Sequence, residues 1–130
     1  MLSKERIIDT FIKLVKIDSP SGEEKQIADY LVEHFKDRGL EVSVDNAGEK
    51  FGGNAGNIVA YLKGNSNVAP ITFCAHMDQV SPCRGVNPII DGNIIRVQSS
   101  YGESAGILKV TPTEGTGYFE ISASGWYETY

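Results

Sequence analysis

The sequence predicts an α/β fold, and three features of its 130 residues carry that prediction. Apolar residues recur at helical spacing in two stretches before residue 39. They then alternate with polar residues over short stretches, as in half-buried strands. Residues 70–75 are apolar almost throughout, which is typical of a strand that is covered on both faces by helices.

Composition and charge narrow the classes of function. The chain is 41% hydrophobic and 22% charged, as ordinary globular proteins are. Its net charge is −5 and its Lys and Arg residues are scattered, which argues against a nucleic-acid partner. No apolar run approaches the roughly 18 residues that a membrane span needs, and no signal peptide is evident. With two cysteines and no disulfide framework, we expect a cytoplasmic protein without membrane partners.

Two helices are expected at the start of the chain. The first should run over residues 4–17 with Ser3 as its N-cap. Ser21 and Glu24 have the spacing of a capping box, which should open a second helix that continues to about Arg38. Gly39 is well placed to end it, because glycine readily adopts the left-handed conformation that follows many helices.

Strands should follow. We expect them at residues 40–44, 58–62 and 70–75, with the GGNAGN stretch at residues 52–57 as a turn rather than a phosphate-binding loop. Residues 88–95 predict a hairpin around Asp91-Gly92, and residues 107–111 and 118–123 a second hairpin. The composition changes near residue 98. We therefore expect two parts, residues 1–97 and a divergent tail at residues 98–130 that is β-rich or poorly ordered.

His76 and Asp78 are the candidate site residues. A neutral imidazole binds zinc through one ring nitrogen, and a carboxylate on the other nitrogen fixes the tautomer. Residues two apart on a strand share a side, so both side chains could reach one site. The alternative is a histidine at a strand end that is hydrogen-bonded locally. A Cys74–His76 nucleophilic pair lacks orienting groups, Cys74 fits a core position, and Cys83 fits a loop cysteine without a role.

Several motifs in order resemble a known family. They are SPSGEE at residues 19–24, GGNAGNIVA at 52–60, ITFCAHMDQV at 71–80, SPCRGV at 81–86 and PIIDG at 88–92. Together they resemble the amino-terminal part of peptidase T-like tripeptidases, members of the co-catalytic zinc metallopeptidases that include aminoacylases and acetylornithine deacetylase. The resemblance implies that residues 1–97 are the amino-terminal part of a three-layer α/β/α catalytic domain.

The resemblance also implies roles and partners. His76 would be a zinc ligand, and Asp78 would be the catalytic carboxylate that orients and polarises it without binding metal itself. The family holds two zinc ions, cleaves short peptides from their amino end, and forms homodimers through a lid domain that this chain does not include.

The chain departs from the family where the bridging carboxylate is due. No Asp follows Asp91 and no His follows His76. Glu103 would align near the expected acid, but we expect it to supply no ligand. The sequence thus predicts a zinc-dependent exopeptidase by resemblance, present here as a truncated and inactive fragment. The alternative is a non-catalytic α/β module that binds a partner or a single metal ion.

Overall fold

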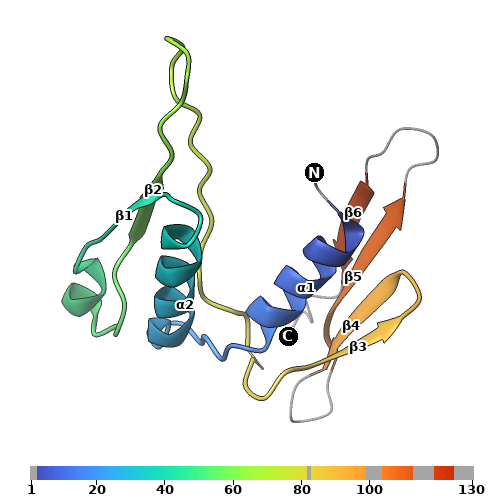
Figure 1. The fold of residues 1–130 in the computed structure, drawn as a ribbon. Helices are drawn as coiled ribbons and strands as arrows, with labels where there is room; N and C mark the ends of the chain where they lie inside the picture. The colour runs from blue at the N-terminus through green and yellow to red at the C-terminus, as the bar shows by residue number, and fades with distance from the viewer. Residues whose placement is uncertain (1–2, 82, 99–103, 113–118, 125–130) are drawn as a thin grey trace. The chain divides into compact units, whose positions relative to one another are not determined.

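The computed structural model describes residues 3–81, 83–98, 104–112 and 119–124 (Figure 1). Two α-helices are followed by strands that form two small antiparallel sheets, which confirms the α/β class. Contacts divide the chain into two compact units, residues 19–79 and residues 1–18 with 80–130. No helix in the described ranges has the length and apolar character that crossing a membrane requires.

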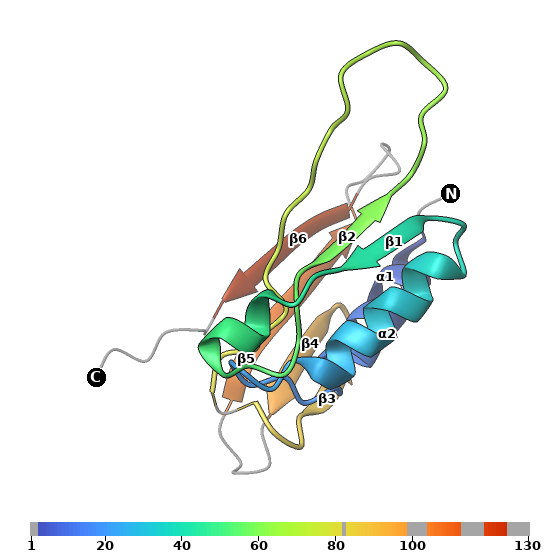
Figure 2. The same cartoon turned by 90° about the vertical axis from the view of Figure 1, so that its left-hand side faces the viewer.

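The unit of residues 19–79 holds one α-helix, a short 3-10 helix and a two-stranded ladder. Helix α2 (Lys25–Lys36) precedes β1 (Glu41–Val44), a short 3-10 helix η1 (Ala47–Phe51) and β2 (Ile58–Tyr61). The strands pair antiparallel, with Val42 opposite Ala60, and α2 lies against both of them (Figures 1 and 2). Ile27 and Ala28 are the buried residues of the helix.

The carboxyl end of α2 closes as the sequence predicts, although the helix stops at Lys36 instead of Arg38. Gly39 has φ +77°, and its N–H donates to the Lys36 carbonyl at 2.9 Å. The Leu40 N–H reaches back to the Phe35 carbonyl at 3.2 Å. These two bonds form a Schellman motif, which satisfies carbonyls that the last turn leaves without a partner.

The predicted capping box at the start of α2 is wrong. The N-cap is Glu24, whose side chain makes no capping bond and instead accepts the Gly22 N–H at 2.7 Å. The Ser21 hydroxyl donates to Asp78. Asn54, 29 residues further along the chain, accepts the Lys25 N–H through its side-chain oxygen at 2.9 Å. The first turn of α2 is therefore capped by a residue from a distant loop, because Ser21 is occupied elsewhere.

The glycine-rich stretch after β1 is a turn, as predicted, and it is held by Asp45. One carboxylate oxygen of Asp45 accepts the N–H groups of Ala47 and Asn57 at 2.9 and 2.8 Å, and the other accepts the Asn57 side-chain amide at 2.9 Å. Gly56 permits this closure, since a Cβ there would lie 1.8 Å from the Asp45 carbonyl oxygen. The Asp45 carboxylate thus supplies the acceptors that hold the two ends of this turn together.

The predicted strand at residues 70–75 is wrong for the described part of the chain. This segment is extended and exposed, with Ile71 82% and Phe73 93% accessible, and no strand partner is assigned to it. Cys74 is exposed as well, which overturns its predicted core position. An apolar run shows what a segment would bury, but a strand forms only where a neighbour supplies ladder hydrogen bonds. Among the described residues, none does so here.

The second unit packs a helix on a hairpin. Helix α1 (Lys4–Val15) begins at Ser3, whose hydroxyl accepts the Arg6 N–H at 3.1 Å, which confirms the predicted N-cap. The helix ends two residues before the predicted Ile17. Its apolar stripe meets side chains of the following strands and loop. The core holds Val15, Val86, Ile95 and Val97, with Ile8 and Phe11 packed against it.

Four strands of this unit form one antiparallel sheet in chain order. They are β3 (Asn87–Asp91), β4 (Ile94–Gln98), β5 (Ser104–Pro112) and β6 (Phe119–Ser124). Gly92, at φ +59°, lies in the tight turn of the predicted first hairpin. The predicted second hairpin is the pairing of β5 with β6, and Tyr118 lies outside the described residues. Because β4 pairs with β5, the sheet continues past residue 97, and the division into residues 1–97 and 98–130 stays a prediction.

Candidate metal-binding site

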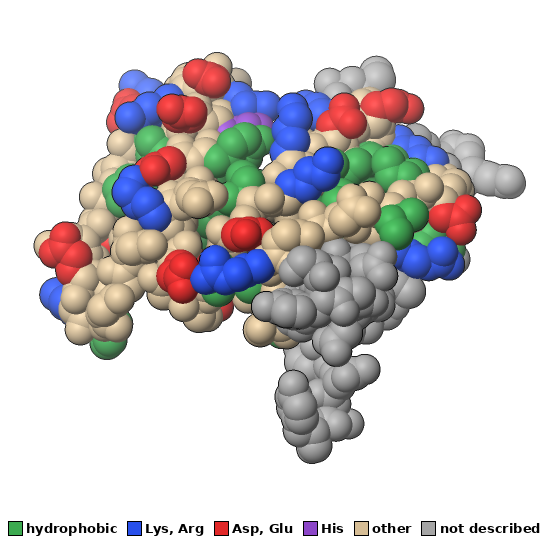
Figure 3. Space-filling view, turned by 90° about the horizontal axis from the view of Figure 1, so that it is seen from below, with side chains coloured by type: hydrophobic (Ala, Val, Ile, Leu, Met, Phe, Trp, Pro, Cys, Tyr) green, Lys and Arg blue, Asp and Glu red, His purple; other side chains and the backbone are tan. Residues whose placement is uncertain are grey.

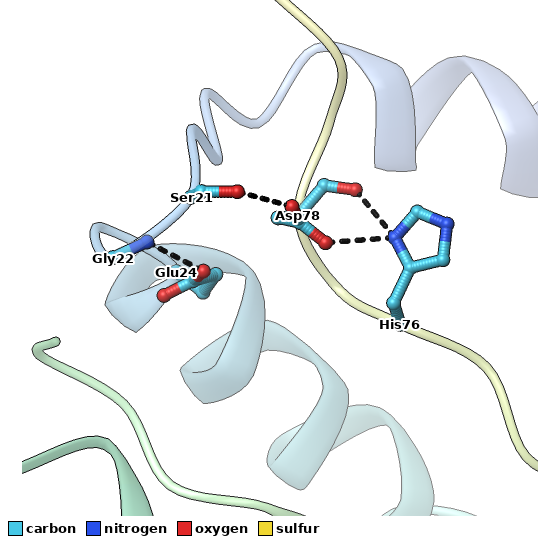
Figure 4. A network of polar contacts seen from close by, with 5 residues as sticks. All are labelled: Ser21, Gly22, Glu24, His76 and Asp78. Atoms are coloured by element: carbon cyan, nitrogen blue, oxygen red, sulfur yellow. Dashed lines mark hydrogen bonds and ion pairs between the residues drawn. The ribbon is translucent and has the colours of Figure 1, made fainter. Parts of the chain in front are cut away.

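His76 and Asp78 lie at the end of the extended segment in the unit of residues 19–79. The segment is fastened just beyond them, where the Gln79 N–H donates to the Ser19 carbonyl at 2.8 Å and Gln79 forms a parallel bridge with Pro20. This attachment brings Asp78 next to Ser21 (Figure 4). Two motifs that are more than fifty residues apart in sequence thus meet in one place.

The surroundings of His76 determine which ring nitrogen is available. Its Nδ1 lies 2.8 Å from Oδ1 of Asp78 and 2.9 Å from the Asp78 backbone oxygen. A carbonyl oxygen can only accept, and so can an ionised carboxylate, so Nδ1 must carry the proton. In the neutral ring this leaves the lone pair on Nε2. The side chain is 78% exposed, so Nε2 is accessible to a metal ion.

Asp78 is held from two sides. One carboxylate oxygen accepts from His76 and the other from the Ser21 hydroxyl (Figure 4). The hydrogen bond from Ser21 lowers the pKa of Asp78, the contact with His76 lowers it further, and partial desolvation opposes both. A carboxyl with a lowered pKa is ionised at neutral pH. It is therefore a permanent acceptor for the Nδ1 proton.

A zinc ion fits this arrangement only in part. An imidazole with one nitrogen bare and the other held by a carboxylate is the form in which histidine binds zinc. A stable site needs three or four protein ligands. In the described ranges no three His, Cys, Asp or Glu residues gather in a way that could hold a metal. The described residues therefore fit one oriented ligand and not a complete centre.

The remaining candidates do not join His76. Glu103 lies outside the described residues. Cys83 is buried and belongs to the other unit, and neither cysteine is in a disulfide. Cys74 is exposed, and among the described residues no hydrogen bond joins its thiol to the ring of His76. A Cys–His nucleophilic pair therefore has no support in the described geometry.

Ser21 and Asn54 are contacts that the sequence did not predict. Its spacing to Glu24 predicts a cap for Ser21, although the SPSGEE stretch is among the motifs that carry the family resemblance. Asn54 lies in the second of those motifs. The Ser21 side chain joins the first and third of these motifs, and the Asn54 N–H joins the second to the first through the Gly22 carbonyl. The order of the motifs in the sequence is the signal that these segments belong to one site. Which side chains bond to each other is seen only in the folded structure.

Charges of both signs are mixed on the surface. Lys25 pairs with Asp29 on one turn of α2, where an Nζ–Oδ2 distance is 2.6 Å. On the face drawn in Figure 3, Lys and Arg side chains lie among Asp and Glu side chains. Exposed pairs of this kind contribute little to stability. They mark the solvent-facing sides of the elements.

No family model matches the chain. It is 33% identical over 100 residues to the uncharacterized protein YqjE of Bacillus subtilis, covering 77% of this chain and 27% of that protein. Two solved structures share the fold at 34% identity. They are aminopeptidase PepT from Bacillus cereus, with a TM-score of 0.70 over 74% of this chain and 26% of that chain, and a tripeptidase from Staphylococcus aureus, with a TM-score of 0.71 over 75% and 26%.

The chain thus spans about a quarter of the length of the curated relatives and structures that it matches. The likeness covers about three quarters of the chain, and both solved structures are peptidases. By sequence and by fold, the chain matches the amino-terminal part of the peptidase T-like peptidases.

Proposed function

We propose that the chain contributes the first metal ligand of a zinc-dependent exopeptidase that acts on short peptides. The observation that carries this proposal is the pair of acceptors on Nδ1 of His76, which leaves Nε2 as an accessible lone pair. The names of its relatives, an aminopeptidase and a tripeptidase, supply the substrate class. We place the protein in the cytoplasm, in keeping with two cysteines that form no disulfide.

The residues of this chain have separate tasks in such a centre. His76 would bind zinc through Nε2, and Asp78 would keep the proton on Nδ1 and raise the basicity of the ring. Two zinc ions, when bound, activate a water molecule and polarise a peptide carbonyl. The bridging carboxylate and the other ligands would have to come from residues that this chain does not supply.

We further propose that the 130 residues alone hydrolyse no peptide. One nitrogen ligand holds zinc weakly, since affinity grows with the number of protein ligands. Calorimetric titration with zinc should show binding weaker than about micromolar that is lost in His76→Ala. His34→Ala is the matched control, because His34 is the other histidine of the chain. Binding tighter than micromolar that needs His76, or binding that survives His76→Ala, would contradict the single-ligand proposal.

A chimera tests the enzymatic role. Residues 4–97 of this chain would replace the matching segment of the Staphylococcus aureus tripeptidase, and release of the amino-terminal residue from tripeptides would be measured. We expect activity that His76→Ala abolishes and His34→Ala leaves in place. A folded, metal-loaded chimera without activity would refute the proposal.

A non-catalytic module is the second candidate function. Ile71 and Phe73 are 82% and 93% exposed, and large exposed apolar side chains mark surfaces that a partner covers. This function predicts the opposite outcome of the chimera experiment, namely a folded protein that cleaves no tripeptide. The same experiment therefore separates the two candidates.

A further inference from the structure

We propose that Ser21 is a positioning residue for the metal ligand, acting on His76 through Asp78. The proposal rests on the proposed metal-binding role of His76 and extends it to a residue in a different motif. Three side chains form a linear chain of hydrogen bonds, from the Ser21 hydroxyl to Asp78 and from Asp78 to Nδ1 of His76 (Figure 4). This series of hydrogen bonds determines which ring nitrogen of His76 faces the metal.

The direction of each bond follows from the chemistry of the groups. An ionised carboxylate only accepts, so both Ser21 and His76 must donate to Asp78. Each partner uses a different oxygen of the carboxylate. The two bonds together prevent rotation of the carboxylate, and a carboxylate that cannot rotate keeps one oxygen on Nδ1.

Water would compete for Asp78 without Ser21. The Asp78 side chain is 35% exposed and that of His76 is 78% exposed, so solvent can reach both groups. If the hydroxyl is removed, one carboxylate oxygen turns to water and the other is no longer held in place. Nδ1 then keeps only the neutral backbone oxygen of Asp78 as a fixed acceptor, so the preference for the Nδ1–H form weakens. A proton on Nε2 blocks metal binding.

The backbone around Ser21 is built to hold it. Gly22, at φ +85°, makes a sharp turn whose N–H is held by the Glu24 carboxylate at 2.7 Å. The Gly22 carbonyl accepts the Asn54 N–H at 3.1 Å. On the other side, the Ser19 carbonyl accepts the Gln79 N–H at 2.8 Å. Ser21 thus lies between two fixed neighbours and directly beside Asp78.

The test begins with the metal-free chain. Nitrogen NMR reports the tautomer of His76 at alkaline pH, where imidazoles are neutral. We expect the Nδ1–H form in the wild type, a mixture of both forms in Ser21→Ala, and recovery of the Nδ1–H form in Ser21→Thr, which keeps the hydroxyl. Ser66→Ala, at an exposed serine of the same unit, should match the wild type. An unchanged tautomer in Ser21→Ala would overturn the proposal.

Zinc titration of the same variants provides the second readout. Loss of a group that holds a metal ligand costs about 10- to 100-fold in affinity, and Ser21 acts one bond further out, so we expect a loss of about three- to tenfold in Ser21→Ala. Ser21→Thr should restore the affinity. Equal zinc affinity in Ser21→Ala and the wild type would overturn the proposed positioning of the metal ligand.

The two proposals fail in different ways. If the tautomer shifts in Ser21→Ala while zinc binding survives His76→Ala, the hydrogen-bond chain stands and the ligand role of His76 falls. If zinc binding requires His76 but the tautomer of His76 is unchanged in Ser21→Ala, the ligand role of His76 stands and the positioning role of Ser21 is refuted.

Discussion

Nδ1 of His76 lies 2.8 Å from a carboxylate oxygen of Asp78, two residues further along the chain. The same nitrogen lies 2.9 Å from the Asp78 backbone oxygen, so one proton is shared between two acceptors. This contact converts a short sequence pattern into a defined chemical state, with Nδ1 protonated and Nε2 available.

Removal of the carboxylate should weaken zinc binding. In Asp78→Ala, Nδ1 loses its charged acceptor, and we expect the affinity for zinc to fall about 10- to 100-fold. Competition with a coloured chelator measures the change. Asp29→Ala removes another exposed carboxylate of the same unit, one that pairs with Lys25, and should leave the affinity unchanged. Equal affinities in the two variants would show that Asp78 does not orient the ligand.

The cap that Asn54 provides should stabilise α2. Its side-chain oxygen accepts the Lys25 N–H at 2.9 Å, and loss of such a cap costs about 0.5–2 kcal/mol. Asn54→Ala should therefore lower the free energy of unfolding by about 1 kcal/mol in urea titrations followed by circular dichroism. Asn67→Ala, in the exposed turn after β2, is the control and should have little effect. If both variants are equally stable, α2 does not depend on this cap.

Gly56 should tolerate no side chain. A Cβ at this position would lie 1.8 Å from the Asp45 carbonyl oxygen, so Gly56→Ala must move backbone. Overpacking of this kind costs about 1–3 kcal/mol. Gly64→Ala is the matched control, because a Cβ there meets nothing within 4 Å. Thermal melts of the two variants should differ by several degrees, and matching melts would show that the loop closes differently.

Ionisation of Asp45 should make the free energy of unfolding of the chain depend on pH in the acid range. The hydrogen bond from the Ala47 N–H lowers its pKa, and the side chain and N–H of Asn57 lower it further. Because the folded-state pKa lies below the ordinary value of about 3.9, the contribution is fully present above that pH and is lost as pH falls through the folded-state pKa. Asp45→Asn should therefore destabilise the chain at neutral pH, and the difference from the wild type should shrink in acid.

Urea titrations at several pH values measure this difference. Asp9→Asn, which removes one negative charge from the exposed face of α1, controls for net charge. A difference between Asp45→Asn and the wild type that grows in acid would contradict the assigned direction of the pKa shift.

Local signals in the sequence predicted the local structure well. Ser3 caps α1, Gly39 ends α2, and the Asp91-Gly92 pair begins the turn of the first hairpin. Each of these depends on a few neighbouring residues whose conformational preferences dominate. The assignment of residues 76–78 as the candidate site also follows from the motif, and it stays a prediction.

Contacts between distant segments could not be read in the same way. Ser21 has the spacing of a cap to Glu24, yet its hydroxyl bonds to Asp78, and Asn54 takes the capping position. Either serine or asparagine can give an N–H group at the start of a helix an acceptor, and the choice depends on which segments meet in space. The run at residues 70–75 has the composition of a central strand but has no strand partner among the described residues. Composition describes the segment and not its neighbours.

The central claim is that Nε2 of His76 binds zinc while Asp78 holds Nδ1. The most direct measurement is nitrogen NMR of the histidine rings while zinc is added to the metal-free chain. We predict that zinc shifts the Nε2 resonance of His76, that Nδ1 of the same ring keeps its proton, and that the ring of His34 is unaffected. A shift at Nδ1 of His76 in place of Nε2, or no shift in His76 at saturating zinc, would contradict the claim.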